Sequence, residues 1–354
     1  MNPDAVDEVR SSGGGAHVSG GDPGTEAGRV PHGGMADPQV LDFSANTNPS
    51  TPDGVARVYK TALSAARSYP SDDYCEYRTE AAGYVGCEGP QVVPTAGGLG
   101  AIRLAIATAV SPGETAVVPY PSFGEYAREI RLQGGVPEFV PCEEVLGTDP
   151  SGHALVVVCN PNNPTGGVYD ASRLRAYADR CREAGTPLLA DEAFLGFTDE
   201  PSLAGHDGAV VARSLTKLFG LPGLRAGFAV ATGECRDRLD TARRAWELGT
   251  PAACVGAHCM EREEFVAETR ERVARERERM RGRLAARFDV YPSTAPFLLL
   301  DVGTGGAVDD LRGTVREHDI AVRDARTFRG LDRHVRVAVR RPRENGLLLD
   351  ALDV

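Results

Sequence analysis

One lysine stands out in this chain because lysine is almost absent from it. Of the 39 lysine and arginine residues, only Lys60 and Lys217 are lysines. Lys217 lies in the segment SLTKLFGLPGLRAGF (214–228), between the hydroxyl of Ser214 and the guanidinium of Arg225. A deprotonated lysine amine can form an imine with an aldehyde, whereas arginine keeps its charge because its pKa stays above ~12. The segment therefore predicts a nucleophilic amine between two groups that can bind phosphate.

A glycine-rich segment offers a second place where an anion could bind. VVPTAGGLGAI (92–102) combines a strand, a glycine turn and the start of a helix. The amides of Gly97, Gly98 and Leu99 can therefore point at an anion at a helix N-terminus. A tight turn that binds no ligand would explain this segment alone equally well.

Two polar side chains follow apolar runs of strand length. The loop NPNNPTG (160–166) follows a buried strand, and its Asn163 can donate a side-chain hydrogen bond at the edge of the sheet. PLLADEAF (187–194) places Asp191 at the end of another apolar strand. A carboxylate in that position is costly unless it is paired. A protonated pyridine nitrogen would be a suitable partner.

These segments belong to an alternating pattern of strands and helices. From about residue 92, short β-branched runs alternate with helical stretches, which predicts an α/β fold with a mostly parallel, twisted sheet. Ligands of such sheets bind at the carboxyl ends of the strands, where all four segments fall. The expected strands are 115–119, 154–159, 187–191, 209–214 and 226–231, and the expected helices include 98–110 and 170–185.

The remaining sequence predicts a tail, an arm and a second domain. We expect a flexible tail over residues 1–29, an N-terminal arm over 30–54, a large domain over 55–250 and a smaller α+β domain over 251–354. The spacing of Glu and Arg predicts a long helix with a solvated, salt-bridged face over 261–288. After it we expect strands at 297–302, 319–324 and 334–339 and a final helix at 344–354.

Composition limits the classes of function. The formal net charge of −11 argues against nucleic acid as a partner. No apolar run approaches the ~20 residues that a membrane-spanning helix needs, and the first thirty residues lack the apolar core of a secretory signal. The eight cysteines form no CxxC pair, and no histidine stands at zinc spacing. We therefore expect free thiols, no metal site and a cytoplasmic protein.

In order and spacing, these motifs resemble the fold-type-I pyridoxal-phosphate enzymes, the aspartate aminotransferase superfamily, over roughly residues 30–354. The resemblance implies that Lys217 forms the Schiff base with pyridoxal phosphate, that Asp191 pairs with the pyridine nitrogen and that Asn163 donates to the 3-oxygen. It also implies that Phe123, in YPSFGEY (120–126), stacks on the ring. The complete implied cofactor-binding set is Tyr69, Gly97, Gly98, Leu99, Phe123, Asn163, Asp191, Phe194, Ser214, Lys217 and Arg225.

Three members of this set carry further information. Leu99 stands where many relatives have a polar residue, and Phe194 replaces a tyrosine that often bonds the 3-oxygen. Both departures weaken the electronic tuning that the resemblance implies, but neither removes the lysine or its carboxylate partner. Tyr69, in SYPSDDY (68–74), matches the tyrosine that reaches the cofactor phosphate of a neighbouring subunit. The resemblance thus implies a homodimer with shared active sites.

Within the superfamily, the chain resembles the threonine-phosphate decarboxylases of cobalamin biosynthesis, followed by the histidinol-phosphate aminotransferases. The segments that carry this resemblance are VPHGGM (30–35), LDFSANTNP (41–49), RSYPSDDY (67–74), RSLTKLFGLPGLR (213–225), AVRD (321–324) and VRVAVRRPREN (335–345). The likeness implies decarboxylation of L-threonine O-3-phosphate to aminopropanol phosphate. Transamination uses the same parts and breaks the Cα–H bond instead, so it stays open as the alternative.

The resemblance also assigns residues to the substrate. Arg336 is implied to bind the α-carboxylate, while Arg323, Arg340 and His32 would serve the substrate's own phosphate. The complete implied substrate-binding set is His32, Asn46, Asn163, Arg323, Arg336 and Arg340. A regulator that holds the cofactor without turnover is a different class of protein. Such regulators usually carry a DNA-binding helix-turn-helix domain, for which the glycine-rich N-terminus is too short.

Overall fold

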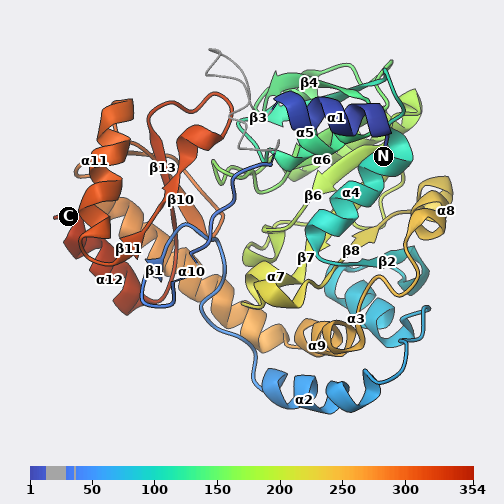
Figure 1. The fold of residues 1–354 in the computed structure, drawn as a ribbon, viewed down its shortest axis with the longest axis horizontal. Coiled ribbons are helices and arrows are strands. Elements are labelled where there is room, and N and C mark those ends of the chain that lie inside the picture. Colours follow the sequence, from blue (N-terminus) through green and yellow to red (C-terminus); the bar gives the residue numbers. More distant parts are fainter. Residues whose placement is uncertain (13–28, 36) are drawn as a thin grey trace.

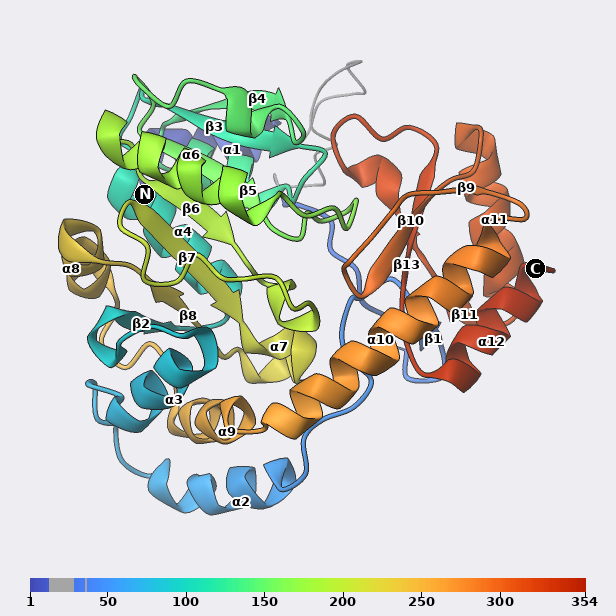
Figure 2. The ribbon, with the colours of Figure 1, turned by 180° about the vertical axis from the view of Figure 1, so that it is seen from behind.

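The computed structural model describes residues 1–12, 29–35 and 37–354. Two lobes lie side by side, each built around its own sheet, and helix α10 (Glu263–Leu284) runs from one to the other (Figure 1 and Figure 2). The larger lobe holds a seven-stranded sheet and the smaller a four-stranded sheet. Among the residues that the structure describes, no helix is long and apolar enough to cross a bilayer.

The seven-stranded sheet has the order β2-β8-β7-β6-β5-β3-β4. Strand β8 runs antiparallel to both of its neighbours, and the other pairs are parallel, which confirms the predicted mostly parallel sheet. The central strands are mostly apolar because helices cover both faces of the sheet. Their polar residues stand at the carboxyl ends, with Asp191 in β6 and Arg213 and Ser214 in β7. The strands are β2 (Val92–Thr95), β3 (Thr115–Tyr120), β4 (Val136–Pro141), β5 (Leu155–Cys159), β6 (Leu188–Asp191), β7 (Ala209–Ser214) and β8 (Gly227–Val230).

Two groups of helices pack on the two faces of this sheet. Helices α4 (Gly98–Ala109), α5 (Glu125–Leu132) and α8 (Gly233–Ala242) share one apolar core with it. Helices α3 (Cys75–Val85), α6 (Ala171–Ala184) and α9 (Thr250–Met260) belong to the core of the other face, and α2 (Val55–Ala65) packs outside α9. Helix α6 shows how local sequence sets such boundaries. The Asp170 carboxylate accepts a hydrogen bond from the Arg173 amide at 2.9 Å, and Gly185 ends the helix with a φ of 72°.

Strand β4 is the one strand of the large sheet that the sequence pattern does not predict. Pro137 and Pro141 interrupt its β-branched pattern. The structure tolerates both prolines because β4 is an edge strand, with β3 on one side. In the described part of the chain, short 3-10 turns complete the connections: η2 (Gly89–Gln91), η3 (Val145–Gly147), η4 (Leu195–Phe197), η5 (Pro222–Leu224) and η6 (Ala325–Thr327).

The smaller lobe contains an antiparallel sheet of order β12-β13-β10-β9, covered by helices. The single strand predicted at 319–324 forms two short strands instead, since β11 pairs with the arm strand β1 (Leu41–Asp42) and β12 pairs with β13. The elements are β9 (Asp289–Val290), β10 (Phe297–Asp301), α11 (Gly305–Arg316), β11 (Ile320–Ala321), β12 (Arg323–Asp324), β13 (His334–Ala338) and α12 (Pro342–Ala351).

Helix α10 combines the predicted salt-bridged face with a buried stripe. Exposed pairs such as Arg275–Glu271 lie on its solvent side, whereas Val273 and Met280 are buried. Helix α9 precedes it and packs against α2 and α3 of the larger lobe. We therefore propose that the boundary between the domains falls within α10 rather than at residue 250.

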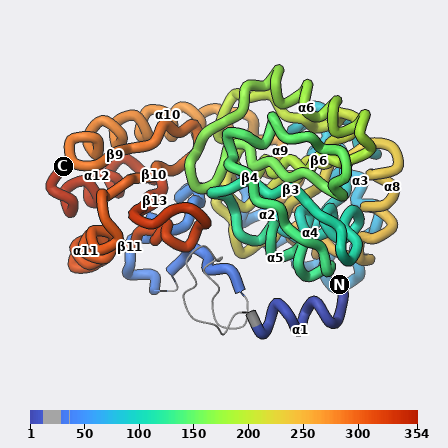
Figure 3. The backbone as a smooth tube through the Cα atoms, turned by 90° about the horizontal axis from the view of Figure 1, so that it is seen from above, coloured from blue at the N-terminus to red at the C-terminus, as the bar shows by residue number. Residues whose placement is uncertain are grey.

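The N-terminus differs from the expected flexible tail over residues 1–29. Residues Pro3–Ser12 form helix α1, which packs on α5 (Figure 3). The Asn2 amide donates to the Leu132 carbonyl at 3.1 Å, and the side chain of Ala5 is buried against the larger lobe. Residues 13–28 of the expected tail lie outside the described residues. All eight cysteines are free thiols, as predicted.

Candidate active site

A cavity of about 300 Å³ lies where the carboxyl ends of the large sheet meet the arm and the smaller lobe. The larger lobe contributes residues that follow β2, β3, β5, β6 and β7, and the smaller lobe contributes residues of β12 and β13. The predicted site residues that line it are His32, Asn46, Gly98, Leu99, Phe123, Asn163, Asp191, Phe194, Ser214, Lys217, Arg225, Arg323 and Arg336.

Lys217 lies in the short helix α7 (Leu215–Leu218), directly after β7, with its amine at the cavity. Burial lowers the pKa of this amine from 10.5 to about 8, helped by the positive charges of Arg336 and Arg225 and opposed by Asp191. Within the described residues, the amine donates no hydrogen bond and forms no ion pair. Lys217 is therefore a buried lysine that loses its proton more readily than an exposed one.

Asp191 ends strand β6 with its carboxylate fully buried. Its oxygens accept hydrogen bonds from the Tyr126 hydroxyl at 2.5 Å and the Ala193 amide at 3.0 Å. Burial raises the pKa of this carboxyl group, and the two hydrogen bonds oppose that rise. Tyr126, on α5, is a partner that the sequence analysis did not identify. It lies three residues after Phe123 in YPSFGEY, but no local pattern there indicates a contact with Asp191.

The phosphate loop predicted after β2 is closely packed against two side chains. Gly97 has a φ of 84°, and a Cβ added there would lie 2.6 Å from Nη2 of Arg225. A Cβ at Gly98 would lie 3.0 Å from the Cβ of Ser214. The first amides of helix α4 therefore face Ser214 and Arg225 at the same end of the cavity. A second hydroxyl that was not predicted, Thr216, shares a hydrogen bond of 2.9 Å with Ser214.

Aromatic side chains form the apolar walls of the cavity. Phe123 lies between β3 and α5 and packs edge-on against Tyr126, with ring centroids 5.6 Å apart. Phe194 follows β6 and packs edge-on against Phe297 at 5.1 Å. Phe123 lines the same cavity as Lys217, so a flat ring bound there would have it available as a stacking surface.

Two arginines of the smaller lobe project into the cavity next to each other. Arg323 on β12 is directly opposite Arg336 on β13 in the antiparallel register. Arg336 donates to the Asn163 side chain and, at 2.9 Å, to the Ser44 carbonyl. Arg323 donates to the Pro31 carbonyl at 2.7 Å and to the Thr327 hydroxyl at 2.9 Å.

Neither guanidinium is neutralised by the protein. Within residues 1–12, 29–35 and 37–354, neither Arg323 nor Arg336 forms an ion pair with a carboxylate, although both are at least nine-tenths buried. Burial lowers the pKa of both groups, and the charge of Arg323 lowers that of Arg336 further. Two buried like charges side by side destabilise the site until an anion binds between or beside them.

His32 and Asn46 complete the wall formed by the arm. Nε2 of His32 lies 3.0 Å from Oε1 of Glu125, and its ring centroid lies 5.7 Å from that of Phe123. The half-exposed imidazole is at the cavity, as predicted. Asn46 is buried, and its Oδ1 atom has no hydrogen-bond partner among the described residues. It therefore retains an unused acceptor at the site.

Three predicted site residues do not line this cavity: Gly97, which precedes Gly98 in the loop after β2, Arg340 and Tyr69. Arg340 was expected to bind the substrate phosphate, but its guanidinium donates to the Asp42 carbonyl at 3.0 Å and pairs with Glu344 at 3.2 Å. Strand β13 ends at Ala338, so the alternation that points Arg336 into the cavity does not extend to residue 340. Tyr69 is 78% exposed and lies on the surface of the larger lobe.

The comparisons with known proteins agree with this geometry. Residues 38–352 match the family model of class I and II aminotransferases, and the chain belongs to this family. It is 30% identical over 338 residues to the threonine-phosphate decarboxylase of Salmonella typhimurium, covering 90% of this chain and 92% of the relative. It is 29% identical over 320 residues to histidinol-phosphate aminotransferase 1 of Archaeoglobus fulgidus, covering 88% and 98%.

Comparison with solved structures shows a similar fold in a protein of the same kind. The structure of histidinol-phosphate aminotransferase from Sinorhizobium meliloti, in complex with pyridoxal-5′-phosphate, superposes with a TM-score of 0.79 at 20% identity, over 87% of this chain and 88% of that one. The predicted membership in the fold-type-I superfamily is confirmed. The protein is thus a pyridoxal-phosphate-dependent enzyme of the class I and II aminotransferase family.

The residues around the cavity fit this cofactor. With pyridoxal phosphate bound, Lys217 could offer its amine to the aldehyde, and the buried Asp191 could offer a carboxylate to the ring nitrogen. The amides that begin α4, together with Ser214 and Arg225, offer donors to the phosphate. The close packing at Gly97 and Gly98 fixes these donors around one small volume.

Proposed function

We propose that the protein decarboxylates L-threonine O-3-phosphate to (R)-1-aminopropan-2-ol O-2-phosphate, a step of cobalamin biosynthesis. The observation that carries the proposal is the pair of buried, unneutralised guanidiniums of Arg323 and Arg336, which lie opposite each other on β12 and β13. A substrate with both a carboxylate and a phosphate supplies two anions to two cations. The similarity to the Salmonella typhimurium decarboxylase supports the same substrate.

The proposed roles follow from the positions of the side chains. Arg336 binds the α-carboxylate, because its guanidinium fork is buried beside Asn163. Arg323 and His32 bind the phosphate, because the hydrogen bond from Arg323 to Pro31 places this guanidinium beside the segment that carries His32. The Asn46 side chain offers a further polar contact to the substrate. Arg340 has no part in this proposal.

When bound, pyridoxal phosphate supplies a sink for the electron pair that is left at the substrate's α-carbon as carbon dioxide departs. Asp191 favours the protonated ring nitrogen through its negative charge. Lys217, with a pKa of about 8, can carry a proton near neutral pH and return it to the α-carbon. Phe123 and Phe194 restrict water around these groups.

Transamination of histidinol phosphate is the second candidate, and the similarity to histidinol-phosphate aminotransferases favours it. Histidinol phosphate carries a phosphate and no carboxylate. With this substrate bound, one of the two guanidiniums would lack a counter-charge. Phosphothreonine satisfies both at once, and for this reason we place decarboxylation first.

The proposal extends to assembly and location. Tyr69 lies outside the cavity of its own chain and is exposed, so we propose that it serves the cofactor phosphate of a second subunit in a homodimer. The eight free thiols favour a reducing compartment, and we propose the cytoplasm.

The two candidate reactions are distinguished by their products. The holoenzyme is incubated with O-phospho-L-threonine labelled at the carboxyl carbon, and separately with histidinol phosphate and 2-oxoglutarate. We expect labelled carbon dioxide and aminopropanol phosphate from the first mixture and little glutamate from the second. Glutamate formation without release of labelled carbon dioxide would reject the decarboxylase and support the aminotransferase.

A further inference from the structure

An exposed pair of aromatic rings lies on the surface of the larger lobe. Tyr69, in the segment between α2 and α3, stacks on Trp246, in the segment between α8 and α9, with ring centroids 4.4 Å apart and planes 26° apart. Tyr69 is 78% exposed and Trp246, the single tryptophan of the chain, is 49% exposed. The Tyr69 hydroxyl has no hydrogen-bond partner in the described part of the chain. The stack thus leaves a hydroxyl available at the surface.

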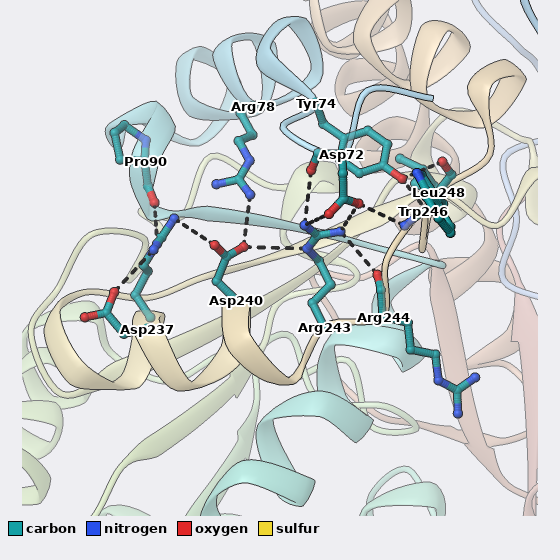
Figure 4. Close-up of polar contacts among 11 residues, drawn as sticks. Asp72, Tyr74, Arg78, Pro90, Asp237, Asp240, Arg243, Arg244, Trp246 and Leu248 are labelled. Carbon is teal, nitrogen blue, oxygen red and sulfur yellow. Dashed lines mark hydrogen bonds and ion pairs between the residues drawn. The ribbon is translucent and has the colours of Figure 1, made fainter. Parts of the chain in front are cut away.

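An ion pair holds together the two segments that carry these rings. Both terminal nitrogens of Arg243 donate to the Asp72 carboxylate, at 2.8 and 3.0 Å, and one of them also donates to the Asp72 carbonyl at 3.1 Å (Figure 4). The Arg243 side chain is 7% exposed, whereas that of Asp72 is 44% exposed. This bidentate geometry fixes the orientation of Asp72 as well as its position.

Backbone contacts add to the ion pair. The Trp246 amide donates to the same Asp72 carboxylate at 2.8 Å. The Tyr74 hydroxyl donates to the Leu248 carbonyl at 2.8 Å and accepts from the Leu248 amide at 3.1 Å (Figure 4). Trp246 and Tyr74 both have left-handed backbones, with φ of 55° and 48°. Such conformations are unfavourable for bulky residues and persist where surrounding contacts enforce them.

A second acidic residue, Asp240, contacts Nε of Arg243. Asp240 lies 3.6 Å from Nε of Arg243 and pairs with Arg78 of α3 at 3.0 Å (Figure 4). Arg243 therefore cannot follow Asp72 outward without losing its contact to Asp240 of α8, which Arg78 of α3 also holds. The loop that carries Tyr69 is therefore held in place at the end of α8 within the single chain.

We propose that Asp72, Arg243 and Trp246 are positioning residues that present the Tyr69 hydroxyl to the cofactor-phosphate site of a second copy of the chain. The inference rests on the proposed function, in which Tyr69 serves that phosphate. Holding a contact residue in its bound conformation before association reduces the entropy lost on binding. An ion pair and a ring stack join the two segments, and each segment contains a residue with a left-handed backbone. The ring of Tyr69 nevertheless remains exposed.

A double-mutant cycle on the full-length protein tests the proposal. The affinity for pyridoxal phosphate and the dimer dissociation constant are measured for the parent, Tyr69→Phe, Asp72→Asn and the double variant. Asp72→Glu serves as the conservative rescue. Asp237→Asn is the matched control, because it is the same Asp-to-Asn change at a different place. Asp237 is an exposed residue of α8 that pairs with Arg236. The emission of Trp246 reports whether the stack persists in each variant.

We expect Asp72→Asn and Tyr69→Phe each to weaken cofactor binding by roughly tenfold, with a red-shifted Trp246 emission in the Asp72 variant. The double variant should be no weaker than Tyr69→Phe alone, since Asp72 acts through Tyr69. Asp72→Glu should recover part of the loss, and Asp237→Asn should match the parent.

Two results would overturn the proposal, and they differ in meaning. If Asp72→Asn weakens cofactor binding by the same factor whether residue 69 is Tyr or Phe, or does not weaken it at all, the ion pair does not act through Tyr69. The positioning role then fails, and the cross-subunit contact of Tyr69 stands. If Tyr69→Phe itself leaves cofactor binding unchanged, the proposed role of Tyr69 fails, and the positioning role fails with it.

Discussion

The charges of Arg225 and Arg336 act on the amine of Lys217 at the cavity. Each guanidinium makes a positive charge on the lysine less favourable, and burial has the same effect with greater weight. An amine that would carry its proton up to pH 10.5 thus becomes available near neutral pH. The two groups that prepare the nucleophile are the same groups that the proposed function assigns to the cofactor phosphate and the substrate carboxylate.

Replacing Lys217 by alanine should abolish covalent attachment of the cofactor and essentially all turnover, because the chain then lacks the buried amine. The measurement is mass spectrometry of the borohydride-reduced protein. Lys60, the other lysine, remains in this variant and acts as an internal control. A reduced cofactor adduct on Lys60 in the parent protein would contradict the assignment.

The pKa of Lys217 predicts a pH dependence for cofactor capture by the apoprotein. Only the neutral amine attacks the aldehyde, so the capture rate should rise with pH and level off above about 8, the pKa that burial and neighbouring charges set. Stopped-flow absorbance across a pH series measures this rate. A rate that continues to rise towards pH 10.5 would show that the amine is not desolvated as the structure indicates.

Strand β8 controls the position of the phosphate loop. It pairs antiparallel with both β2 and β7, and Gly227 is opposite Thr95 on one side and Ser214 on the other. A Cβ at Gly227 would lie 2.5 Å from the Gly97 carbonyl carbon and 2.7 Å from the Gly98 nitrogen. These are backbone atoms, which cannot move aside as a flexible side chain would.

Gly227→Ala should therefore push the loop away from β8, weaken cofactor binding and destabilise the fold by about 1–3 kcal/mol. Cofactor titration and thermal unfolding of the apoprotein measure the two effects. Gly249→Ala is the matched control, since its φ is −66° and a Cβ there meets nothing within 4 Å. Cofactor binding by Gly227→Ala as tight as that of the control would contradict the packing argument.

The elements that carry motifs could be predicted from the sequence. The strands that lead to Asn163, Asp191 and Ser214 are mostly apolar, with Arg213 of β7 as the charged exception, and each ends at the cavity as expected. In a parallel sheet, this pattern determines both the strand and the end where ligands bind. Strand β4 could not be predicted in this way, because an edge strand tolerates the prolines that argue against a strand elsewhere.

The partners of buried groups were harder to predict. The hydrogen bond from Tyr126 to Asp191 joins α5 to β6 over 65 residues of sequence, and no local pattern specifies it. Arg340 shares the alternation of Arg336, yet β13 ends before it and Glu344 pairs with it instead. In both cases the outcome depends on tertiary contacts rather than on residue type and spacing.

The whole molecule brings the two lobes together around one cavity, and both lobes contribute charged side chains to it. The larger lobe supplies Lys217 and Asp191, and the smaller lobe supplies Arg323 and Arg336. Tyr69 lies outside this arrangement in its own chain. The proposed dimer would give each cavity a Tyr69 from the other copy.

Mixing two inactive or impaired chains tests this exchange. One chain carries Tyr69→Phe with Lys217 intact, and the other carries Lys217→Ala with Tyr69 intact. A hybrid dimer then contains one site with both native residues, so activity should rise above that of either variant alone. The control is the same mixture kept below its dimerisation concentration. A fully active monomer in dilute parent enzyme would contradict the shared site.

The central claim is that Arg323 and Arg336 select a substrate with two anionic groups, and a comparison of substrates tests it most directly. The ratio of kcat/KM for O-phospho-L-threonine and L-threonine is measured for the parent, Arg323→Gln and the control Arg333→Gln, an exposed arginine paired with Asp301. Two charged hydrogen bonds to the phosphate at ~1.5–3 kcal/mol each should favour phosphothreonine by at least ~100-fold in the parent. The ratio should collapse in Arg323→Gln and persist in Arg333→Gln. Equal use of both substrates by the parent, or an equal loss for both in Arg323→Gln, would contradict the claim.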